Sequence, residues 1–163
     1  MANTSRPRGF KPYGRNPQIG KYKADGGQTI AVGDLVIMDS DGFIDIATAA
    51  GGDDIVGVAA SSVTSATEGD AIYVYNDPNQ MFIVQCTDAL DQNDMYATST
   101  GTAVDFSGAT GVMVVLSQDV TGGCLKIVEL ASDVKTGEIS GLGSSAQVIV
   151  RIDPANHLYG PQA

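Results

Sequence analysis

A single histidine, His157, limits the acid-base and metal chemistry that this chain can carry. A Ser-His-Asp triad, a histidine metal site and a histidine general base would each have to be built around that one residue. His157 lies in the terminal sequence DPANHLYGPQA, outside every run of apolar residues. We therefore predict that it is a surface residue in a C-terminal tail spanning residues 154–163.

Three aspartates, Asp39, Asp41 and Asp45, are candidate calcium ligands, because hard cations need several oxygens on one short turn. The glycine and the bidentate glutamate of an EF-hand loop are not at the required spacing, and tight turns also use Asp and Gly. The pattern therefore favours a plain hairpin turn at 39–42, and we predict no metal site.

The sequence GLGSSA at 141–146 has the letters of a dinucleotide-binding loop, G-x-G-x-x-A. Such a loop follows a strand and opens a helix that faces the pyrophosphate, whereas this one precedes the strand-like run at 146–153. The many carboxylates could supply the acid and the nucleophile of a glycosidase, but most of them stand beside glycine in turns, where solvated acids are expected. We predict no cofactor, no catalytic residues and no enzymatic activity.

The two cysteines, Cys86 and Cys124, are too few for a disulfide framework. In a chain of this length a lone pair is more often two reduced, buried thiols than a disulfide, and we predict the reduced state. The spacing leaves open whether the two residues meet.

Charge is distributed unevenly along the chain. Residues 1–24 contain no acid and six basic residues, which are Arg6, Arg8, Lys11, Arg15, Lys21 and Lys23. The rest of the chain carries all 19 acidic residues against Lys126, Lys135 and Arg151, a net charge of −16. An acidic body repels phosphate backbones, so nucleic acid is not an expected partner.

No stretch approaches the roughly 18 apolar residues of a membrane helix, and the start lacks the apolar segment of a secretory signal, so we expect a soluble protein made in a cytoplasm.

Prolines punctuate the basic segment 1–24. Pro7, Pro12 and Pro17 are evenly spaced, and each removes a backbone donor and fixes φ. We therefore predict neither strand nor helix there, but an extended N-terminal arm. Aromatic residues that alternate with the cations favour binding to a partner, although an arm packed against its own body would have the same composition. These aromatic residues are Phe10, Tyr13 and Tyr22.

From residue 25 onward, apolar runs alternate with turn sequences. Eight runs rich in β-branched and aromatic residues fall at 28–39, 42–49, 54–61, 70–76, 80–86, 111–118, 124–131 and 146–153. Turn sequences such as Asp41-Gly42 and Gly122-Gly123 separate them, and no segment keeps a helical period. The spacing predicts an all-β body at 25–153, a compact antiparallel β-barrel or β-sandwich that follows the extended arm.

The same residues resemble the capsid decoration (cement) and head structural proteins of tailed phages. The start MANTSRPRGFKP is similar to the M-A-N-x-x-x-P-x-G-F-x-P start of that family. VGDLV at 32–36, IVGV at 55–58, YVYNDP at 73–78 and MFIVQ at 81–85 then follow in the family's order, so the likeness covers roughly residues 1–90. Between Tyr13 and Gly27 the sequence departs from the family, whose members commonly carry a longer junction there.

The resemblance implies a β-structured subunit, often oligomeric, that adds to the outside of an assembled capsid. We therefore expect a decoration protein on the virion surface, a homotrimer at local three-fold positions that binds the major capsid protein and neither nucleic acid nor membrane. In this hypothesis arm cations pair with shell carboxylates while arm rings fill apolar notches. The expected contact residues are Arg6, Arg8, Phe10, Lys11, Tyr13 and Arg15. The alternative is a tail, baseplate or virion-surface module that recognises host glycan.

Overall fold

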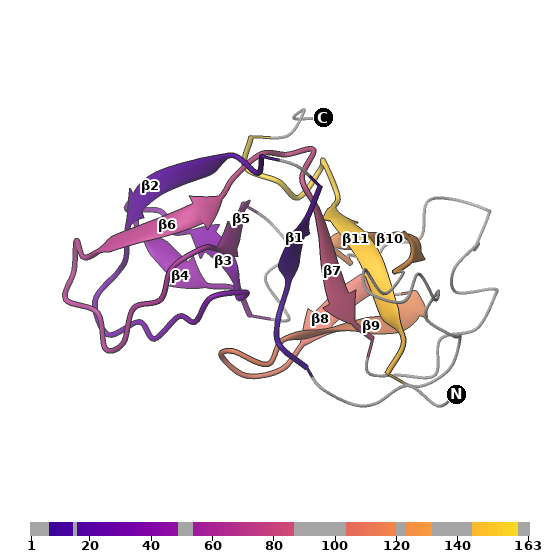
Figure 1. Ribbon diagram of the computed structural model, residues 1–163. Helices are drawn as coiled ribbons and strands as arrows, with labels where there is room; N and C mark the ends of the chain where they lie inside the picture. The colour runs from indigo at the N-terminus through magenta and orange to yellow at the C-terminus, as the bar shows by residue number, and fades with distance from the viewer. Residues whose placement is uncertain are drawn as a thin grey trace.

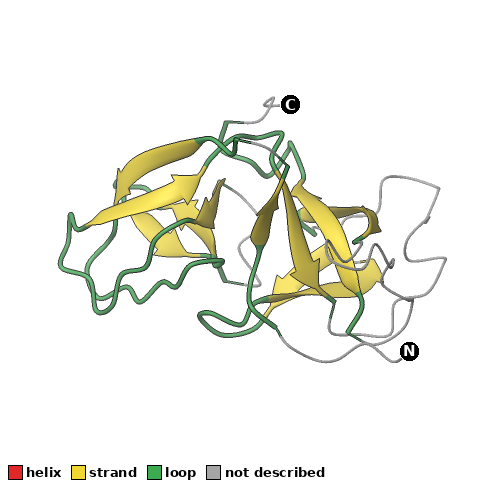
Figure 2. Ribbon diagram, in the orientation of Figure 1, coloured by secondary structure: helices red, strands yellow, loops and turns green. Residues whose placement is uncertain are grey.

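The computed structural model describes residues 7–14, 16–48, 54–86, 104–119, 123–131 and 145–159. Within these residues the regular secondary structure consists of β-strands, with no helix (Figure 2). The strands are β1 (Lys11–Tyr13), β2 (Ile19–Lys23), β3 (Leu35–Met38), β4 (Ile44–Ile46), β5 (Ile55–Ala59), β6 (Ala71–Tyr75), β7 (Met81–Gln85), β8 (Val104–Ser107), β9 (Val114–Asp119), β10 (Leu125–Leu130) and β11 (Gln147–Ile152). The predicted all-β architecture is confirmed, and each of the eight predicted runs overlaps a strand. In this part of the chain no helix has the length and apolar character of a membrane span.

The strands form two antiparallel sheets that lie side by side (Figure 1). The N-terminal sheet has the order β2-β6-β5-β3-β4, and the C-terminal sheet has the order β1-β7-β11-β10-β8-β9. Each sheet curls toward closure, because isolated bridges join Ala24 to Ile44 in the first and Cys86 to Val115 in the second. The result is two small, partly closed barrels.

β5 is buried along its whole length and contributes to two hydrophobic cores. Ile55 and Val58 pack in the core that includes the inward residues of the C-terminal sheet, whereas Val56 and Ala59 pack inside the N-terminal sheet. Gly57 lies between them, where a Cβ atom would overlap the carbonyl oxygen of Tyr75. Glycine at this position therefore lets β6 pass close to β5 while β5 joins the two barrels.

The N-terminal segment is part of both sheets rather than a free arm. β1 pairs with β7 at one edge of the C-terminal sheet, and β2 pairs with β6 at one edge of the N-terminal sheet. The prediction that residues 1–24 contain no strand is therefore wrong for residues 11–13 and 19–23. Pro12 is tolerated because an edge strand needs hydrogen-bond partners on one side only. Lysines on such strands also oppose edge-to-edge aggregation.

Phe10 anchors this segment to the body. Its side chain is 1% exposed and packs in the core shared by the two sheets, and its N–H donates a 2.8 Å hydrogen bond to the carbonyl oxygen of Gly33. Gly9, with φ of 70°, passes so close that a Cβ atom would lie 2.6 Å from that same oxygen. Full burial of a phenylalanine contributes about 2 to 3 kcal/mol, which accounts for the docking of the chain here.

The C-terminal segment crosses in the opposite direction, back to the N-terminal sheet. The N–H of Ile55 donates to the carbonyl of Asn156, and the N–H of Leu158 donates to the carbonyl of Ile55, both at 2.9 Å. His157 lies between these bonds and is 2% exposed. The prediction that His157 is a surface residue is therefore wrong, because backbone pairing with β5 fixes this part of the C-terminal tail.

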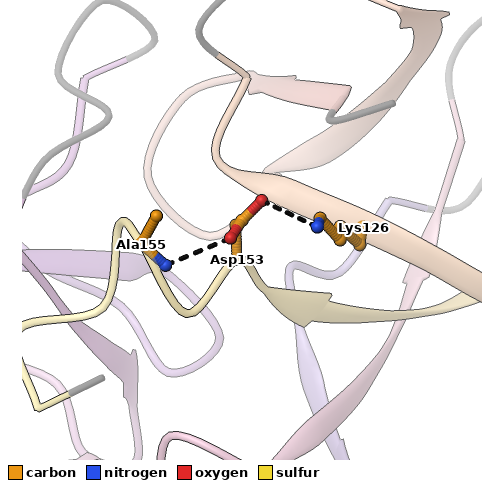
Figure 3. Close-up of polar contacts among 3 residues, drawn as sticks. All are labelled: Lys126, Asp153 and Ala155. Atoms are coloured by element: carbon orange, nitrogen blue, oxygen red, sulfur yellow. Dashed lines mark hydrogen bonds and ion pairs between the residues drawn. The ribbon is translucent and has the colours of Figure 1, made fainter. Parts of the chain in front are cut away.

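Asp153 stabilises the turn that starts this crossing (Figure 3). One carboxylate oxygen accepts a 3.1 Å hydrogen bond from the N–H of Ala155, and the other lies 3.2 Å from the Nζ atom of Lys126 in β10. The chain therefore leaves β11 in a defined direction, toward β5.

Candidate partner-binding surface

The solvent-facing side of the C-terminal sheet brings together basic residues that are far apart in sequence. Residues paired directly across strands lie on the same face, and the pairing places Tyr13, Met81 and Arg151 in one row. Arg151 pairs in turn with Lys126. Lys11 precedes Tyr13 by two residues in β1 and so lies on the same side. The opposite side of the same strands fills the core with Phe82, Val84, Val148 and Val150.

A shallow hollow lies beside β1 on this sheet. It has a volume of about 60 Å³ and is lined by Arg8, Gly9, Lys11, Ile83, Val84, Gln85 and Gln147. The volume corresponds to a few water molecules or one small polar group, such as a carboxylate.

We call the exposed side of this sheet the basic face. It consists of Arg8, Lys11, Tyr13, Met81, Lys126 and Arg151.

Most cations of the basic face have no acidic partner in the part of the chain that the structure describes. Lys126 forms the ion pair with Asp153, and no other ion pair occurs among these residues. Arg8, Lys11 and Arg151 are exposed, and Tyr13 is 39% exposed. Glu129, opposite Ile149, also lies on this side of the sheet. The face can therefore offer unpaired guanidinium and ammonium groups beside an aromatic ring.

The predicted contact residues have different outcomes. Arg8, Lys11 and Tyr13 lie together at the surface, as a contact would require. Phe10 is buried in the core of its own chain, so the prediction that it fills a notch on a partner is wrong. Arg6 and Arg15 lie outside the described residues, and their roles stay predictions.

Sequence reasoning missed Arg151 and Lys126 as neighbours of the N-terminal cations. The alternation of QVIVRI indicates that Arg151 points away from the core, and Arg151 is exposed, although Ile149 on the same side of the strand is buried. No local signal shows that β11 lies one strand away from β1, because the intervening β7 connects them through non-local pairing.

A second exposed surface lies on β2 and β6. Ile19 pairs with Tyr75, Lys21 with Tyr73 and Lys23 with Ala71, which puts these residues on one side of the sheet. Ile19 is 50% exposed and Tyr73 is 44% exposed, and both lysines are exposed. We call Ile19, Lys21, Lys23, Ala71, Tyr73 and Tyr75 the β2–β6 face.

Three aspartates gather where the N-terminal sheet closes on itself. Ligand oxygens of Asp25, Asp39 and Asp45 lie within 4.8 Å of one another, and all three residues are partly exposed. Burial, followed by the charges of Asp25 and Asp39, raises the pKa of Asp45. Asp41, a predicted member of this group, is instead an exposed turn residue whose N–H donates to Asp39. Asp25 takes its place because its N–H bonds to the carbonyl of Ile44, a contact that sequence spacing does not reveal.

This aspartate cluster has the oxygen chemistry of a hard-cation site. However, an oxygen of Asp39 already accepts hydrogen bonds from the N–H groups of Asp41 and Phe43, and an oxygen of Asp25 accepts one from Gly26. Two of the three carboxylates therefore hold turn backbones, whereas Oδ1 of Asp45 is buried without a hydrogen-bond partner, and the cluster concentrates negative charge.

Tyrosines and His157 form a polar network between the C-terminal segment and the N-terminal sheet. Asn76 Nδ2 donates to the Tyr22 hydroxyl at 2.7 Å, and that hydroxyl donates to the Tyr159 hydroxyl at 3.1 Å. The N–H of Tyr159 donates to Nδ1 of His157 at 3.1 Å. Burial lowers the pKa of His157, and the charge of Asp77 opposes this effect. Burial and then the Tyr22 hydroxyl raise the pKa of Tyr159 to about 12.

The two cysteines are free and buried, as predicted. Burial, and then the nearby charge of Asp105, raises the pKa of the Cys124 thiol to about 12. A thiol with that pKa is almost entirely protonated at neutral pH, so Cys124 has the environment of an inert core residue rather than of a nucleophile.

No protein-family model matches the chain, and no curated protein matches it.

Proposed function

We propose that this chain is a capsid decoration (cement) protein that binds the outer surface of an assembled tailed-phage head and stabilises it. The observation that carries the proposal is the basic face, on which exposed cations gather around Tyr13 although the chain has a net charge of −10. The resemblance of residues 1–90 to head decoration proteins supports the same function. The proposed partner is the major capsid protein, and the proposed location is the virion surface after synthesis in the host cytoplasm.

The contact is made by an ordered strand rather than by a free arm. Lys11 and Tyr13 are held by pairing with β7, so their backbone is already fixed before a partner binds. Fixing the backbone of one residue costs about 1 to 2 kcal/mol, a cost that a disordered arm would meet on every binding event. On the basic face the cations pair with shell carboxylates, and Tyr13 and Met81 supply apolar contact area.

Several weak contacts must act together on the shell. An exposed ion pair contributes only about 0 to 1 kcal/mol, so one basic face binds weakly. Linking subunits, as in the expected homotrimer at a local three-fold position, converts weak contacts into a strong one through avidity. A protein that binds the assembled lattice and not free capsid protein stabilises the lattice by mass action. This function uses no enzymatic step, cofactor or metal.

Co-sedimentation with heads assembled without this chain tests the proposal. Wild-type protein is expected to bind, and Lys11→Gln/Arg151→Gln is expected to lower the apparent affinity by about tenfold or more, since two ion pairs are lost from each of several linked subunits. The control Ser62→Glu/Thr64→Glu makes the same change in net charge at exposed sites outside the basic face. It is expected to bind like wild type.

Two outcomes contradict the proposal at different levels. If wild-type protein does not sediment with the heads, the function itself is refuted. If the two double variants lose affinity equally, net charge rather than the basic face controls binding. Circular dichroism and thermal unfolding of each variant show whether it is folded before its affinity is compared.

A further inference from the structure

The β2–β6 face is a solvent-exposed surface that the proposed shell contact does not use. It belongs to the N-terminal sheet, whereas the basic face belongs to the C-terminal sheet. Neither β2 nor β6 contains an acidic residue, and the face carries Lys21 and Lys23 beside two large side chains, Ile19 and Tyr73. Tyrosine is enriched at protein contacts, and the exposed ring of Tyr73 with Ile19 gives this face an apolar centre beside a polar rim that contains the two lysines.

The two lysines of this face lack an ion-pair partner on their own chain, as far as the structure describes it. Lys21 lies opposite Tyr73, and Lys23 lies opposite Ala71, so no carboxylate faces either of them across the strand pair. An acidic protein surface would therefore complement the face in charge while covering Ile19 and Tyr73.

The same chain carries such a surface next to the β2–β6 face. Asp25 follows Lys23 by two residues, about 7 Å along an extended chain, and it belongs to the cluster with Asp39 and Asp45. Their mutual repulsion contributes to the raised pKa of Asp45. One surface of the N-terminal sheet therefore carries unpaired cations in one half and crowded carboxylates in the adjoining half.

Adjacent halves of opposite charge make a surface complementary to a second copy of itself. When a two-fold axis relates two copies, the lysines of each copy can face the carboxylates of the other, so that the same contact forms twice. We propose that the β2–β6 face binds the aspartate cluster of a second copy of this chain, so that the protein self-associates through its N-terminal sheets. The role of this contact in a shell-bound oligomer rests on the function proposed above, but the contact itself is tested without heads.

Sedimentation velocity of the purified full chain, over a range of protein concentration, measures the self-association. The wild-type mass is expected to exceed that of the monomer, 16.8 kDa, and to fall toward it when the ionic strength rises, because salt screens exposed charges. The variant Lys21→Glu/Lys23→Glu is expected to raise the dissociation constant at least about tenfold, because like charges then oppose each other. A wild-type protein that stays monomeric at every concentration overturns the proposal.

A charge-swap pair identifies the two halves of the contact. Asp25→Lys/Asp45→Asn removes the acidic half and leaves Asp39, whose carboxylate holds the turn. Each double variant alone is expected to be monomeric, whereas an equimolar mixture of the two is expected to regain the larger mass. A mixture that stays monomeric, although both variants give wild-type circular dichroism, overturns the pairing of these two surfaces.

Matched substitutions separate the apolar part of the face from general surface effects. Ile19→Ser is expected to weaken self-association several-fold, whereas Val128→Ser, at a similarly exposed position on β10 in the other sheet, is expected to leave it unchanged. Equal effects of the two substitutions contradict the assigned location. If the protein binds heads as a monomer, the proposed function is supported and the self-association is refuted. If it self-associates without binding heads, the self-association is supported and the proposed function is refuted.

Discussion

The buried carboxylate of Asp34 accepts a 2.8 Å hydrogen bond from the N–H of Gly111, a residue 77 positions later in the chain. Its other oxygen accepts a 2.9 Å bond from the N–H of Ala31. Asp34 precedes β3 in the N-terminal sheet, and Gly111 lies in the turn between β8 and β9 of the C-terminal sheet. Burial raises the pKa of Asp34, and the two N–H groups oppose that effect. One side chain therefore joins a loop of each sheet at their junction.

Replacement of Asp34 by alanine is expected to destabilise the protein by about 2 to 3 kcal/mol, because two partly buried N–H groups lose their acceptor. Asp70→Ala is the matched control, since the exposed Asp70 accepts a single 2.8 Å bond from the N–H of Thr67. It is expected to cost less than about 1 kcal/mol. Urea unfolding at neutral pH measures both values, and equal losses would show that Asp34 does not join the sheets.

Gly9→Ala tests the crossing of the N-terminal segment over Gly33. Gly9 has φ of 70°, and its Cβ atom would lie 2.6 Å from the carbonyl oxygen of Gly33. Gly27→Ala is the control, because Gly27 has φ of 80° but no atom within 4 Å of the added Cβ. We expect about 1 kcal/mol of destabilisation from the left-handed conformation in both, and a further loss of at least about 1 kcal/mol in Gly9→Ala. Equal thermal unfolding midpoints for the two variants would contradict the docked position of the N-terminal segment.

Because the pKa of the buried His157 is lowered, we expect the protein to lose stability in mild acid. The folded pKa of His157 lies below the ordinary value of 6.5, so the unfolded chain binds a proton first as the pH falls. This contribution to stability is complete above about pH 7 and is lost as the pH decreases through 6.5 toward the lowered pKa. In the wild type, unfolding free energy should fall over that window by more than it does in His157→Gln. Because the chain has one histidine, proton NMR reports its pKa directly, and a midpoint at or above 6.5 would refute the buried position.

Asp45→Asn is expected to stabilise the protein at neutral pH. Burial and the charges of Asp25 and Asp39 raise the folded pKa of Asp45, so its ionised form costs stability above that pKa. The gain should be about 0.2 to 1 kcal/mol, the range for partly exposed charge interactions, and should vanish below about pH 3, where the wild-type carboxyl is protonated in both states. Asp41→Asn, an exposed site outside the cluster, is the control and should change stability little. A destabilised Asp45→Asn would mean that the carboxylate has a favourable partner.

Local pattern was enough to locate most strands. The apolar runs at 70–76 and 80–86 predicted β6 and β7, whose alternate residues are buried because one side of each sheet faces a core. β8 was missed because Val104–Ser107 is short and has an aspartate between its two large apolar residues. β1 and β2 were missed because prolines and glycines weigh against a strand in general, whereas an edge strand tolerates them.

The candidate surface could be predicted only in part. Arg8, Lys11 and Tyr13 were identified from the alternation of cations and rings, and they lie together at the surface. Phe10 belongs to the same pattern but is buried, because its ring packs in the core that the two sheets share. Composition does not show which ring of the segment packs there. His157 was assigned to the surface because its local sequence is polar, yet pairing with Ile55 buries it.

From the sequence alone, the protein is predicted to be all-β, with its cations concentrated near the start of an otherwise acidic chain. These properties follow from side-chain alternation and composition, which are local. Three features follow from the fold: β1 joins the C-terminal sheet, the segment around His157 returns to β5, and Arg151 lies in one row with Tyr13. Strand pairing and register depend on residues that are far apart in the sequence. They are fixed by the apolar side chains that become buried when the whole chain folds around its two cores.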